Sequence, residues 1–455
     1  MAFGRADRQH KSDVRIGCGS AYAEDRLEPA VDLAERGQLD YLSLDCLAER
    51  TLVHAQLRRL ADPGTGYDVR LREIIRRLVP PCVENGVTLI GNMGAANPEA
   101  AADVTLSMVR DMGHRGLRVA SIVGDNVLDL VRRTDPVMAE TGRPLSELWG
   151  QVASANVYIG GEKIIEALEQ GADIVLGGRI ADPSLFLGPL MYAFGWRQDD
   201  WDLKAQGQVV GHLLECGTHG TGGNFADPPY RVVAGLARAG LPMAEVRADG
   251  EAVVTKLPGT GGVVDVLNCK AQLVYEIHDP ANYLTPDLTM DVRNVQLEQV
   301  GLDRVRVSGA RGRPWPERLK VLVGVLEGYI GEGEITFAGP GAYDRARLGA
   351  EVVQERMAID RPAIDELRVD YIGVNSVHGP VSPRPAAEPY EVRLRIAGRA
   401  RDKAAAEWLG QEVEYLYFGP AAGAGARKSV RQVLGMYSTY IPRDQVRLEV
   451  NVREA

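Results

Sequence analysis

The alternation of strand and helix patterns over residues 14–200 most constrains the fold of this chain. Short runs rich in β-branched residues are separated by stretches of helical periodicity, which is typical of a parallel sheet with right-handed crossovers. We expect strands at 14–19, 40–46, 87–92, 117–123 and 172–177, and helices at 26–36, 51–60, 70–85, 98–112 and 161–170. The pattern predicts an α/β domain over residues 14–235 with a mostly parallel, doubly wound, Rossmann-like sheet. A (β/α) barrel is the alternative, because both folds begin in this way.

Residues 236–455 show a different pattern of apolar and polar residues. Apolar and polar residues alternate over 319–338, where glycines stand at 324, 328, 331 and 333, and this predicts antiparallel strands with a bend or a hairpin. Further strands are expected at 304–308, 366–374, 391–397 and 446–452, and helices at 341–357 and 401–417. We therefore expect a second, α+β domain over 236–455.

Composition excludes several classes of partner. The 455 residues carry a formal net charge of −10, whereas proteins that bind nucleic acid carry basic stripes. No apolar run approaches the ~20 residues that span a membrane, and the N-terminus lacks the apolar core of a secretion signal. The five cysteines are scattered and form no CxxC pair. We expect a cytoplasmic homo-oligomer with reduced thiols and a small-molecule substrate, without nucleic-acid or membrane partners.

Polar side chains stand where the expected strands end. Asp45 belongs to the end of the second strand, Asn92 to the third, and Arg179 and Asp182 follow the fifth. Parallel α/β folds bind ligands outside the carboxyl ends of their strands, so these four side chains are expected to converge on a substrate. Asn92 and Arg179 would orient a carboxyl group. The alternative for Asp182, which precedes a proline, is a helix cap.

One short segment in mid-chain concentrates reactive side chains. His212, Glu215 and Cys216 stand at i, i+3 and i+4, so one helical turn would project them from one face. Gly217 fits a helix stop, and His219 would follow in the loop. Glu215, His212 or His219 would serve acid/base catalysis. Cys216 would serve as a nucleophile, although the negative end of a helix dipole raises the pKa of a thiol, and a divalent metal is a further alternative.

Two glycine-rich loops share one short pattern. Gly-Thr-Gly-Gly occurs after His219 and again after Pro258. Such loops allow a concave nest of backbone N–H groups that would hold a phosphate, a carboxylate or an oxyanion; two tight turns are the alternative. Lys256 precedes the second loop and would steer an anion into it, and His278 lies in a second polar cluster. The candidate loop residues are Gly220, Gly222, Gly223, Gly259, Gly261 and Gly262.

The sequence lacks the motifs of common nucleotide and metal sites. Gly17-Cys-Gly19 begins like a dinucleotide fingerprint, but Tyr22 stands where the third glycine belongs. No GxxxxGK[ST], HExxH or GxSxG motif occurs. We therefore assign no cofactor, and the identity of any metal stays unknown.

Several longer motifs do stand in a recognisable order. They are N-M-G-A-A-N-P at 92–98, G-G-R-I-A-D-P-S-L-F at 177–186, H-L-L-E-C-G at 212–217, G-G-N-F-A-D at 222–227, P-G-T-G-G at 258–262, Y-E-I-H-D-P at 275–280 and E-G-E-I at 332–335. Together they resemble the acyclic terpene utilisation (AtuA-like) family. The resemblance implies a cytoplasmic protein of branched, isoprenoid-like acid catabolism with CoA esters as expected substrates. Some relatives carry a further C-terminal ferredoxin-like domain, which this chain is not expected to include.

These observations favour an enzyme that acts on an activated carboxylic acid, in the first place an acyl-CoA. The chemistry would be proton transfer next to the carbonyl, as in a hydration, an isomerisation or a carbon–carbon cleavage by a lyase, with the glycine loops holding an oxyanion or a phosphate. One alternative is a hydrolase or acyl transferase that uses Cys216. Another is a non-catalytic subunit or small-molecule-binding partner of a catabolic enzyme complex.

Overall fold

The chain forms two compact units. A computed structural model describes residues 9–383 and 387–455. Unit 1 contains the described residues up to Trp149 together with Ala153–Gly324 and Met436–Ala455, and unit 2 contains Gly150–Val152 and Val325–Gly435. The division expected near residue 235 falls inside unit 1, since strands from both sides of that position share one sheet.

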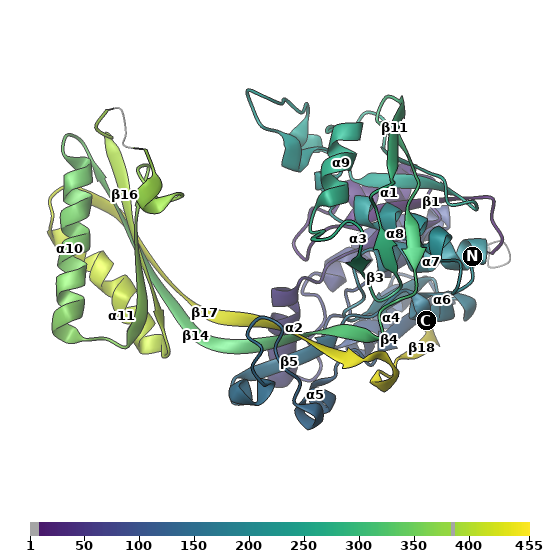
Figure 1. Ribbon diagram of the computed structural model, residues 1–455, viewed down its shortest axis with the longest axis horizontal. Helices are drawn as coiled ribbons and strands as arrows, with labels where there is room; N and C mark the ends of the chain where they lie inside the picture. Colours follow the sequence, from purple (N-terminus) through teal and green to yellow (C-terminus); the bar gives the residue numbers. More distant parts are fainter. Residues whose placement is uncertain (1–8, 384–386) are drawn as a thin grey trace. The chain divides into compact units, whose positions relative to one another are not determined.

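Five parallel strands form the middle of the large sheet in unit 1 (Figure 1). They are β1 (Asp13–Ser20), β2 (Tyr41–Leu44), β3 (Thr88–Gly91), β4 (Arg118–Val123) and β6 (Ile174–Gly177), in the order β1-β2-β3-β6-β4. Each matches an expected strand, so the mostly parallel sheet is confirmed. The chain adds β1 to β4 in one direction and then inserts β6 between β3 and β4. These parallel strands therefore lack the reversal of order that defines Rossmann-like winding.

Antiparallel strands extend the sheet on both sides. Beyond β1 lie β7 (Pro242–Arg247), β8 (Ala252–Lys256), β12 (Arg304–Ser308) and β11 (Gln296–Gly301), and β18 (Glu449–Glu454) pairs with β4. The antiparallel strands expected in the second half of the chain are thus confirmed. The order of the described strands runs openly from β11 to β18, so the barrel alternative does not apply.

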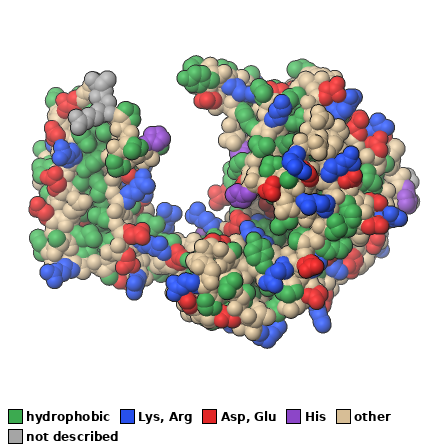
Figure 2. Space-filling model, viewed as in Figure 1, with side chains coloured by type: hydrophobic (Ala, Val, Ile, Leu, Met, Phe, Trp, Pro, Cys, Tyr) green, Lys and Arg blue, Asp and Glu red, His purple; other side chains and the backbone are tan. Residues whose placement is uncertain are grey.

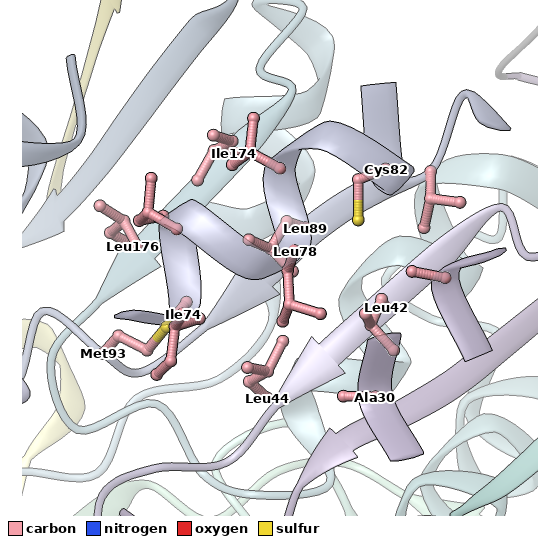
Figure 3. Close-up of a cluster of buried hydrophobic side chains, with 14 of the residues drawn as sticks. Ala30, Leu42, Leu44, Ile74, Leu78, Cys82, Leu89, Met93, Ile174 and Leu176 are labelled. Atoms are coloured by element: carbon pink, nitrogen blue, oxygen red, sulfur yellow. The ribbon is translucent and has the colours of Figure 1, made fainter. Parts of the chain in front are cut away.

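Alternation along β2 shows why helices cover both faces of this sheet. Leu42 and Leu44 point into a core shared with α1 (Glu28–Arg36), α3 (Leu71–Asn85) and α4 (Pro98–Asp111). Figure 3 shows Leu42 and Leu44 near Ile74 and Leu78 of α3, which lie one helical turn apart on its apolar face. Ser43 points to the other face, where its hydroxyl donates to the carbonyl of Leu185 at 2.9 Å.

The helix that contains Leu185 is α7 (Ser184–Phe194), and it packs against α8 (Trp201–Leu214) and α6 (Glu162–Glu169). Residues Ser184 to Ala193 of α7 are all buried, so no polar face marks this helix in the sequence. The shorter elements are α2 (Glu49–Ala61), α5 (Leu128–Thr134), α9 (Val266–Val274), β5 (Val152–Val157), β9 (Tyr283–Leu284), β10 (Thr289–Asp291) and β13 (Arg311–Arg313).

Unit 2 has the β-α-β-β-α-β order of a ferredoxin-like fold. It takes the part of β14 (Arg318–Ala338) after Gly324, then α10 (Ala342–Asp360), β15 (Ile364–Ile372), β16 (Glu391–Ala400), α11 (Lys403–Glu414) and the part of β17 (Gly423–Pro442) up to Gly435, with the strands ordered β15-β16-β14-β17. Figure 1 shows α10 and α11 together on one face of this sheet, where both contact β16. Phe337, Leu394 and Leu409 are buried between the two layers.

The glycines of β14 allow close packing, which corrects the expectation of a hairpin. Residues 318–338 form one continuous strand. A Cβ at Gly331 would lie 1.9 Å from the carbonyl oxygen of Ala406 in α11, and one at Gly333 would lie 2.4 Å from the Cβ of Val413. Only glycine therefore lets this helix approach the strand so closely.

The surface mixes charges of both signs, and Figure 2 shows acidic and basic side chains interspersed over the face in view. No helix in the described part of the chain combines the length and apolar character needed to cross a membrane.

Candidate functional site

The carboxyl ends of the parallel strands in unit 1 surround a cavity of about 430 Å³, here named the acidic cavity. Its wall takes residues that follow β1, β2 and β6, the residues after α8, and a segment near α9. It contains six of the expected site residues: Asp45, Arg179, Asp182, Glu215, Cys216 and His219. Asp25, Glu49 and Glu276 also line it. Six carboxyl groups and one arginine therefore share this wall.

Asn92 positions Asp45 and does not itself line the acidic cavity. Its amide donates to Asp45 Oδ1 at 2.7 Å, while its own Oδ1 accepts the backbone N–H of Cys46 at 2.7 Å. Asn92 is fully buried. Burial raises the pKa of Asp45, and the nearby carboxyl group of Asp182 raises it further. Asn92 thus holds an acidic group in place instead of contacting a substrate.

Arg179 is the cation at the centre of these acids. Its guanidinium donates to Asp182 Oδ1 at 3.1 Å and to the hydroxyl of Tyr158 at 2.9 Å, and it lies 3.6 Å from Glu49 Oε1. Burial opposes its charge, but Asp182, Tyr158 and Glu49 together raise its pKa. These partners occupy its Nη1 and Nη2 donors, whereas its Nε–H has no partner among the described residues, so only this donor is left for the expected contact with a substrate carboxyl group.

Glu215 and His212 form a buried pair. Glu215 directly follows α8, and its Oε1 lies 2.9 Å from His212 Nδ1 one helical turn earlier. The shared face expected for these two residues is therefore confirmed. His212 is fully buried and does not line the acidic cavity, and burial lowers its pKa to about 4. The imidazole is thus neutral at physiological pH, and it contacts the cavity wall only through Glu215.

The second oxygen of Glu215 is available for chemistry. Glu215 is 6% exposed, and its Oε2 has no hydrogen-bond partner in the part of the chain that the structure describes. Burial raises the pKa of Glu215 well above its ordinary value, and the carboxyl groups of Asp182 and Glu276 raise it further. An unpartnered buried carboxyl oxygen carries a desolvation cost, and such groups are concentrated where a protein carries out proton transfer.

Cys216 shares the cavity but lacks the surroundings of a nucleophile. Burial and the adjacent Glu215 raise the pKa of its thiol to about 12. Reactive cysteines instead sit beside cations or at helix N-termini, which lower the pKa. The acidic wall and the preceding helix end therefore both disfavour a thiolate at this position.

Two further cavities adjoin the acidic cavity by sharing parts of its wall. The apolar cavity, about 780 Å³, shares Glu49, Arg179, Asp182 and Glu276. The arginine cavity, about 800 Å³, shares Tyr22, Asp25 and Thr218. His278 is exposed and lines the apolar cavity, whereas His219 lines the acidic one, with its ring edge-on to Tyr275 at 5.8 Å.

The glycine loops are tight turns. Four of their backbone N–H groups donate to carbonyl groups within the protein, so these four do not form the expected anion nest. The N–H groups of Gly220 and Gly222 donate to the carbonyls of Gly217 and His219, both at 3.0 Å. Those of Gly261 and Gly262 donate to backbone carbonyls at 2.7 and 2.9 Å. The left-handed backbone at Gly222, Gly259 and Gly262 explains the choice of glycine there.

These loops nevertheless border a ligand-sized space, because Gly223 and Gly259 line the arginine cavity. Lys256 does not face it: its ammonium pairs with Asp303 at 3.0 Å and donates to the carbonyl of Thr260 at 3.0 Å. Lys256 therefore stabilises the second loop from within and does not steer an anion.

Within residues 9–383 and 387–455, no group of three or more His, Cys, Asp or Glu side chains is arranged to hold a metal ion.

Several residues of the site were not among the expected ones. Tyr158 directly follows β5, a strand that the sequence pattern did not predict, and Tyr283 belongs to β9. Both tyrosines line the apolar cavity, and Glu276 lines both it and the acidic cavity. The rule that ligands bind beyond the ends of parallel strands does not point to Tyr158, because β5 pairs with β14 outside the parallel sheet.

Comparison with known proteins gives the same family as the motifs. The model of the acyclic terpene utilisation family protein AtuA matches residues 14–452. Because this match covers nearly the whole sequence, the chain belongs to the acyclic terpene utilisation family. No curated protein matches the chain.

Proposed function

We propose that the acidic cavity is the active site of an enzyme that acts on an acyl-CoA, or a related thioester, of a branched acyclic acid. The reaction is proton transfer near the thioester carbonyl, within a hydration, an isomerisation or a carbon–carbon cleavage. Family membership supports the acyclic terpene context. The observation that carries the proposal is Glu215, a buried acid in the cavity wall with one oxygen on His212 and the other unpartnered.

Glu215 is suited to act first as a general acid and then as a general base. Its protonated Oε2 gives a proton to the substrate, and the resulting carboxylate takes a proton back from the substrate or from water. His212 stays neutral throughout and holds the carboxyl group through the hydrogen bond at Oε1. His212 is the positioning residue of this pair, because it touches Glu215 and not the cavity.

The carboxyl-rich wall favours a neutral substrate group over an anion. Six carboxyl groups face the acidic cavity against one arginine, and the raised pKa values of Asp45, Asp182 and Glu215 mean that these surroundings already disfavour negative charge, so a free carboxylate would be disfavoured there as well. A thioester carbonyl carries no charge and accepts a hydrogen bond from a protonated acid. This supports an activated acid as the substrate in preference to the free acid.

The decisive experiment compares turnover of the wild type with that of Glu215→Gln. Purified protein is incubated with saturated and unsaturated branched acyl-CoA esters, and products are followed by mass spectrometry in deuterated water to detect proton exchange. We expect Glu215→Gln to lose about 100-fold or more in rate, since acid/base groups contribute on that scale. Glu166→Gln, on the outer side of α6 and paired with Lys163, is the matched control and should keep full activity. Equal rates for wild type and Glu215→Gln would refute the proposal.

Alkylation tests the competing role of Cys216. A nucleophilic cysteine would react with iodoacetamide faster than a free thiol, whereas the raised pKa predicts slower labelling of Cys216 than of cysteine in solution at neutral pH. Peptide mapping after timed labelling measures this rate. Rapid, selective modification of Cys216 would instead support the hydrolase or acyl transferase alternative.

A further inference from the structure

Two of the six carboxyl groups that line the acidic cavity differ from the other four in their burial. Asp45 is 9% exposed and Glu215 is 6% exposed. The remaining four are half-buried or exposed, namely Asp25, Glu49, Asp182 and Glu276. Burying a carboxyl group costs free energy, so the burial of Asp45 and Glu215 in one cavity wall points to a chemical role for both.

Asp45 is held in the wall by one of its carboxyl oxygens. Its Oδ1 accepts the Asn92 amide at 2.7 Å and the backbone N–H of Leu47 at 3.2 Å. The orientation of the Asn92 amide is fixed, because its own Oδ1 accepts the backbone N–H of Cys46. None of the described residues donates a hydrogen bond to Asp45 Oδ2. This second oxygen is therefore available to a ligand in the cavity that Asp45 lines.

Glu215 has the same arrangement with different neighbours. Its Oε1 lies on His212, and its Oε2 has no hydrogen-bond partner among the described residues. The charged form of Asp45 is favoured by two N–H donors and by nearby Arg179, whereas only Arg179 favours the charged form of Glu215. Asp45 therefore releases its proton more readily than Glu215 does. Burial still raises the pKa of Asp45, which makes its carboxylate a stronger base than an exposed one.

We propose that Asp45 is a second catalytic residue of the acidic cavity, the base that removes a proton from the carbon next to the thioester carbonyl while Glu215 acts as the acid. Asp45 Oδ2 takes the proton from that carbon, and the electron pair of the broken C–H bond forms the carbon–carbon double bond of an enol. The carbonyl oxygen takes the proton of Glu215 Oε2. The total charge in the cavity stays the same, because one proton leaves the substrate and another enters it.

This assignment rests on the proposed function and adds the base that the acid Glu215 requires. Asn92 is then a positioning residue, because it fixes Asp45 without lining the cavity. When the enol returns to the thioester, Asp45 can supply a proton that it has exchanged with water. The proposal therefore predicts exchange of hydrogen between water and the carbon next to the carbonyl.

Saturated thioesters test this step by itself, because a saturated chain has no double bond to hydrate. The probes are 3-methylbutanoyl-CoA and 3,7-dimethyloctanoyl-CoA that carry deuterium next to the carbonyl, and mass spectrometry follows the loss of deuterium to water. Asp45→Asn keeps an oxygen for Asn92 and Leu47 but replaces Oδ2 by an NH2 group that does not act as a base. We expect exchange at saturating probe to fall at least about 100-fold.

Asp68→Asn is the matched control. Asp68 is 3% exposed, its Oδ1 accepts the backbone N–H of Arg70 at 2.7 Å, and its Oδ2 has no partner in the described part of the chain. Burial raises the pKa of Asp68 to about 6. Asp68 lines none of the acidic, apolar and arginine cavities. Asp68→Asn should therefore keep exchange within about threefold of the wild type, since general acid/base catalysis needs a group within reach of the substrate.

Chemical rescue separates a base from a residue that only supports the fold. Asp45→Gly makes room for a small carboxylate in the place of the missing side chain. Added formate should raise the exchange rate of this variant at least about tenfold, and chloride at the same ionic strength should not, because formate is a base and chloride is not. Exchange by Asp45→Asn within about tenfold of the wild type would overturn the assignment, as would a loss in Asp45→Gly that formate does not relieve.

The outcomes also distinguish this assignment from the proposed function. If Glu215→Gln loses turnover while Asp45→Asn exchanges deuterium like the wild type, Asp45 is not the base and the proposed function stands. If Asp45→Asn loses exchange and Asp45→Gly is rescued by formate while Glu215→Gln keeps full turnover, Asp45 stands as the base and the role of Glu215 fails. If the wild type exchanges deuterium from neither probe, both proposals are wrong.

Discussion

Carboxyl groups meet arginines in two very different ways in this protein. On the open face of the unit 2 sheet, neighbouring strands supply their own partners: Arg393 with Glu334 at 2.6 Å, and Arg399 with Glu327 at 2.7 Å. In the acidic cavity of unit 1, six carboxyl groups line a wall that holds Arg179 as its one arginine. The residue types are the same, but the ratio of acid to base and the burial differ.

This difference separates carboxylates that form ion pairs within the fold from a carboxyl group that is suited to proton transfer. A carboxylate opposite its own arginine on a half-exposed sheet has its charge and hydrogen-bond partner within the sheet. Glu215, buried among other acids, is shifted toward its protonated form and keeps one oxygen without a partner. Only the second arrangement lets a carboxyl group keep its proton to a higher pH than usual, as a group that transfers protons requires.

The largest expected effect is on stability, from removing the central cation. Arg179→Met should destabilise the fold by about 3–5 kcal/mol, because Asp182 and Glu49 lose their buried partner. Arg393→Met on the unit 2 sheet should cost about 1 kcal/mol or less, since solvent reaches that pair. Urea unfolding of both variants gives the two values. Equal losses would contradict the distinction between the two regions.

The next largest effect is on the way the free energy of unfolding depends on pH. The folded pKa of Glu215 lies above the ordinary value of 4.5, so between these two values the folded chain retains a proton that the unfolded chain releases. The stability that this retained proton contributes to the folded chain is fully present below pH 4.5 and is lost as the pH rises toward the folded pKa of Glu215. Glu215→Gln lacks it, so the variant should gain on the wild type by up to ~1.4 kcal/mol per pH unit across that window.

Glu245→Gln is a control for which the stability difference from the wild type should change with pH in the opposite direction. Hydrogen bonds from Arg304 lower the pKa of Glu245, so its contribution is present above pH 4.5 and is lost as pH falls. Urea unfolding across a pH series measures both variants against the wild type. A stability difference for Glu215→Gln that does not change with pH would show that this carboxyl group is not perturbed.

The smallest effect concerns the paired arginines of unit 2. A double-mutant cycle on Arg393 and Glu334 should give a coupling of about 0.5–1 kcal/mol that declines as salt is added. The same cycle on Arg179 and Asp182 should give a larger coupling with little salt dependence, because that arginine side chain is only 3% exposed. Couplings of the same size and salt sensitivity would mean that burial does not separate the two regions.

Local patterns predicted the regular elements and part of the site. Short β-branched runs identified the five parallel strands, which are largely buried, and amphipathic periods identified α3 and α10, which have one face in a core and another near water. The spacing of His212 and Glu215 was enough to predict that they meet, since residues three apart share a helix face. The strand-end rule brought Asp45, Arg179 and Asp182 to one cavity.

Other features depend on contacts that no local pattern contains. Helix α7 lacks periodicity because it is buried on all sides, and β5 carries the buried polar residues Ser154 and Asn156, which read as loop residues. The glycines of β14 resemble turn signals, although Gly331 and Gly333 make room for α11 within a continuous strand. In each case the deciding partner comes from a distant part of the sequence.

The sequence by itself determined the family, the strand and helix pattern, and which residues could carry acid/base chemistry, because these depend on residue type and short spacing. The tertiary structure decided which of them matter. It pairs Lys256 with Asp303 and gives four backbone N–H groups of the glycine turns carbonyl partners. It also places Glu215 among other acids, where Oε2 has no hydrogen-bond partner among the described residues. Burial and the count of opposing charges set the pKa of a group, and both are properties of the folded surroundings.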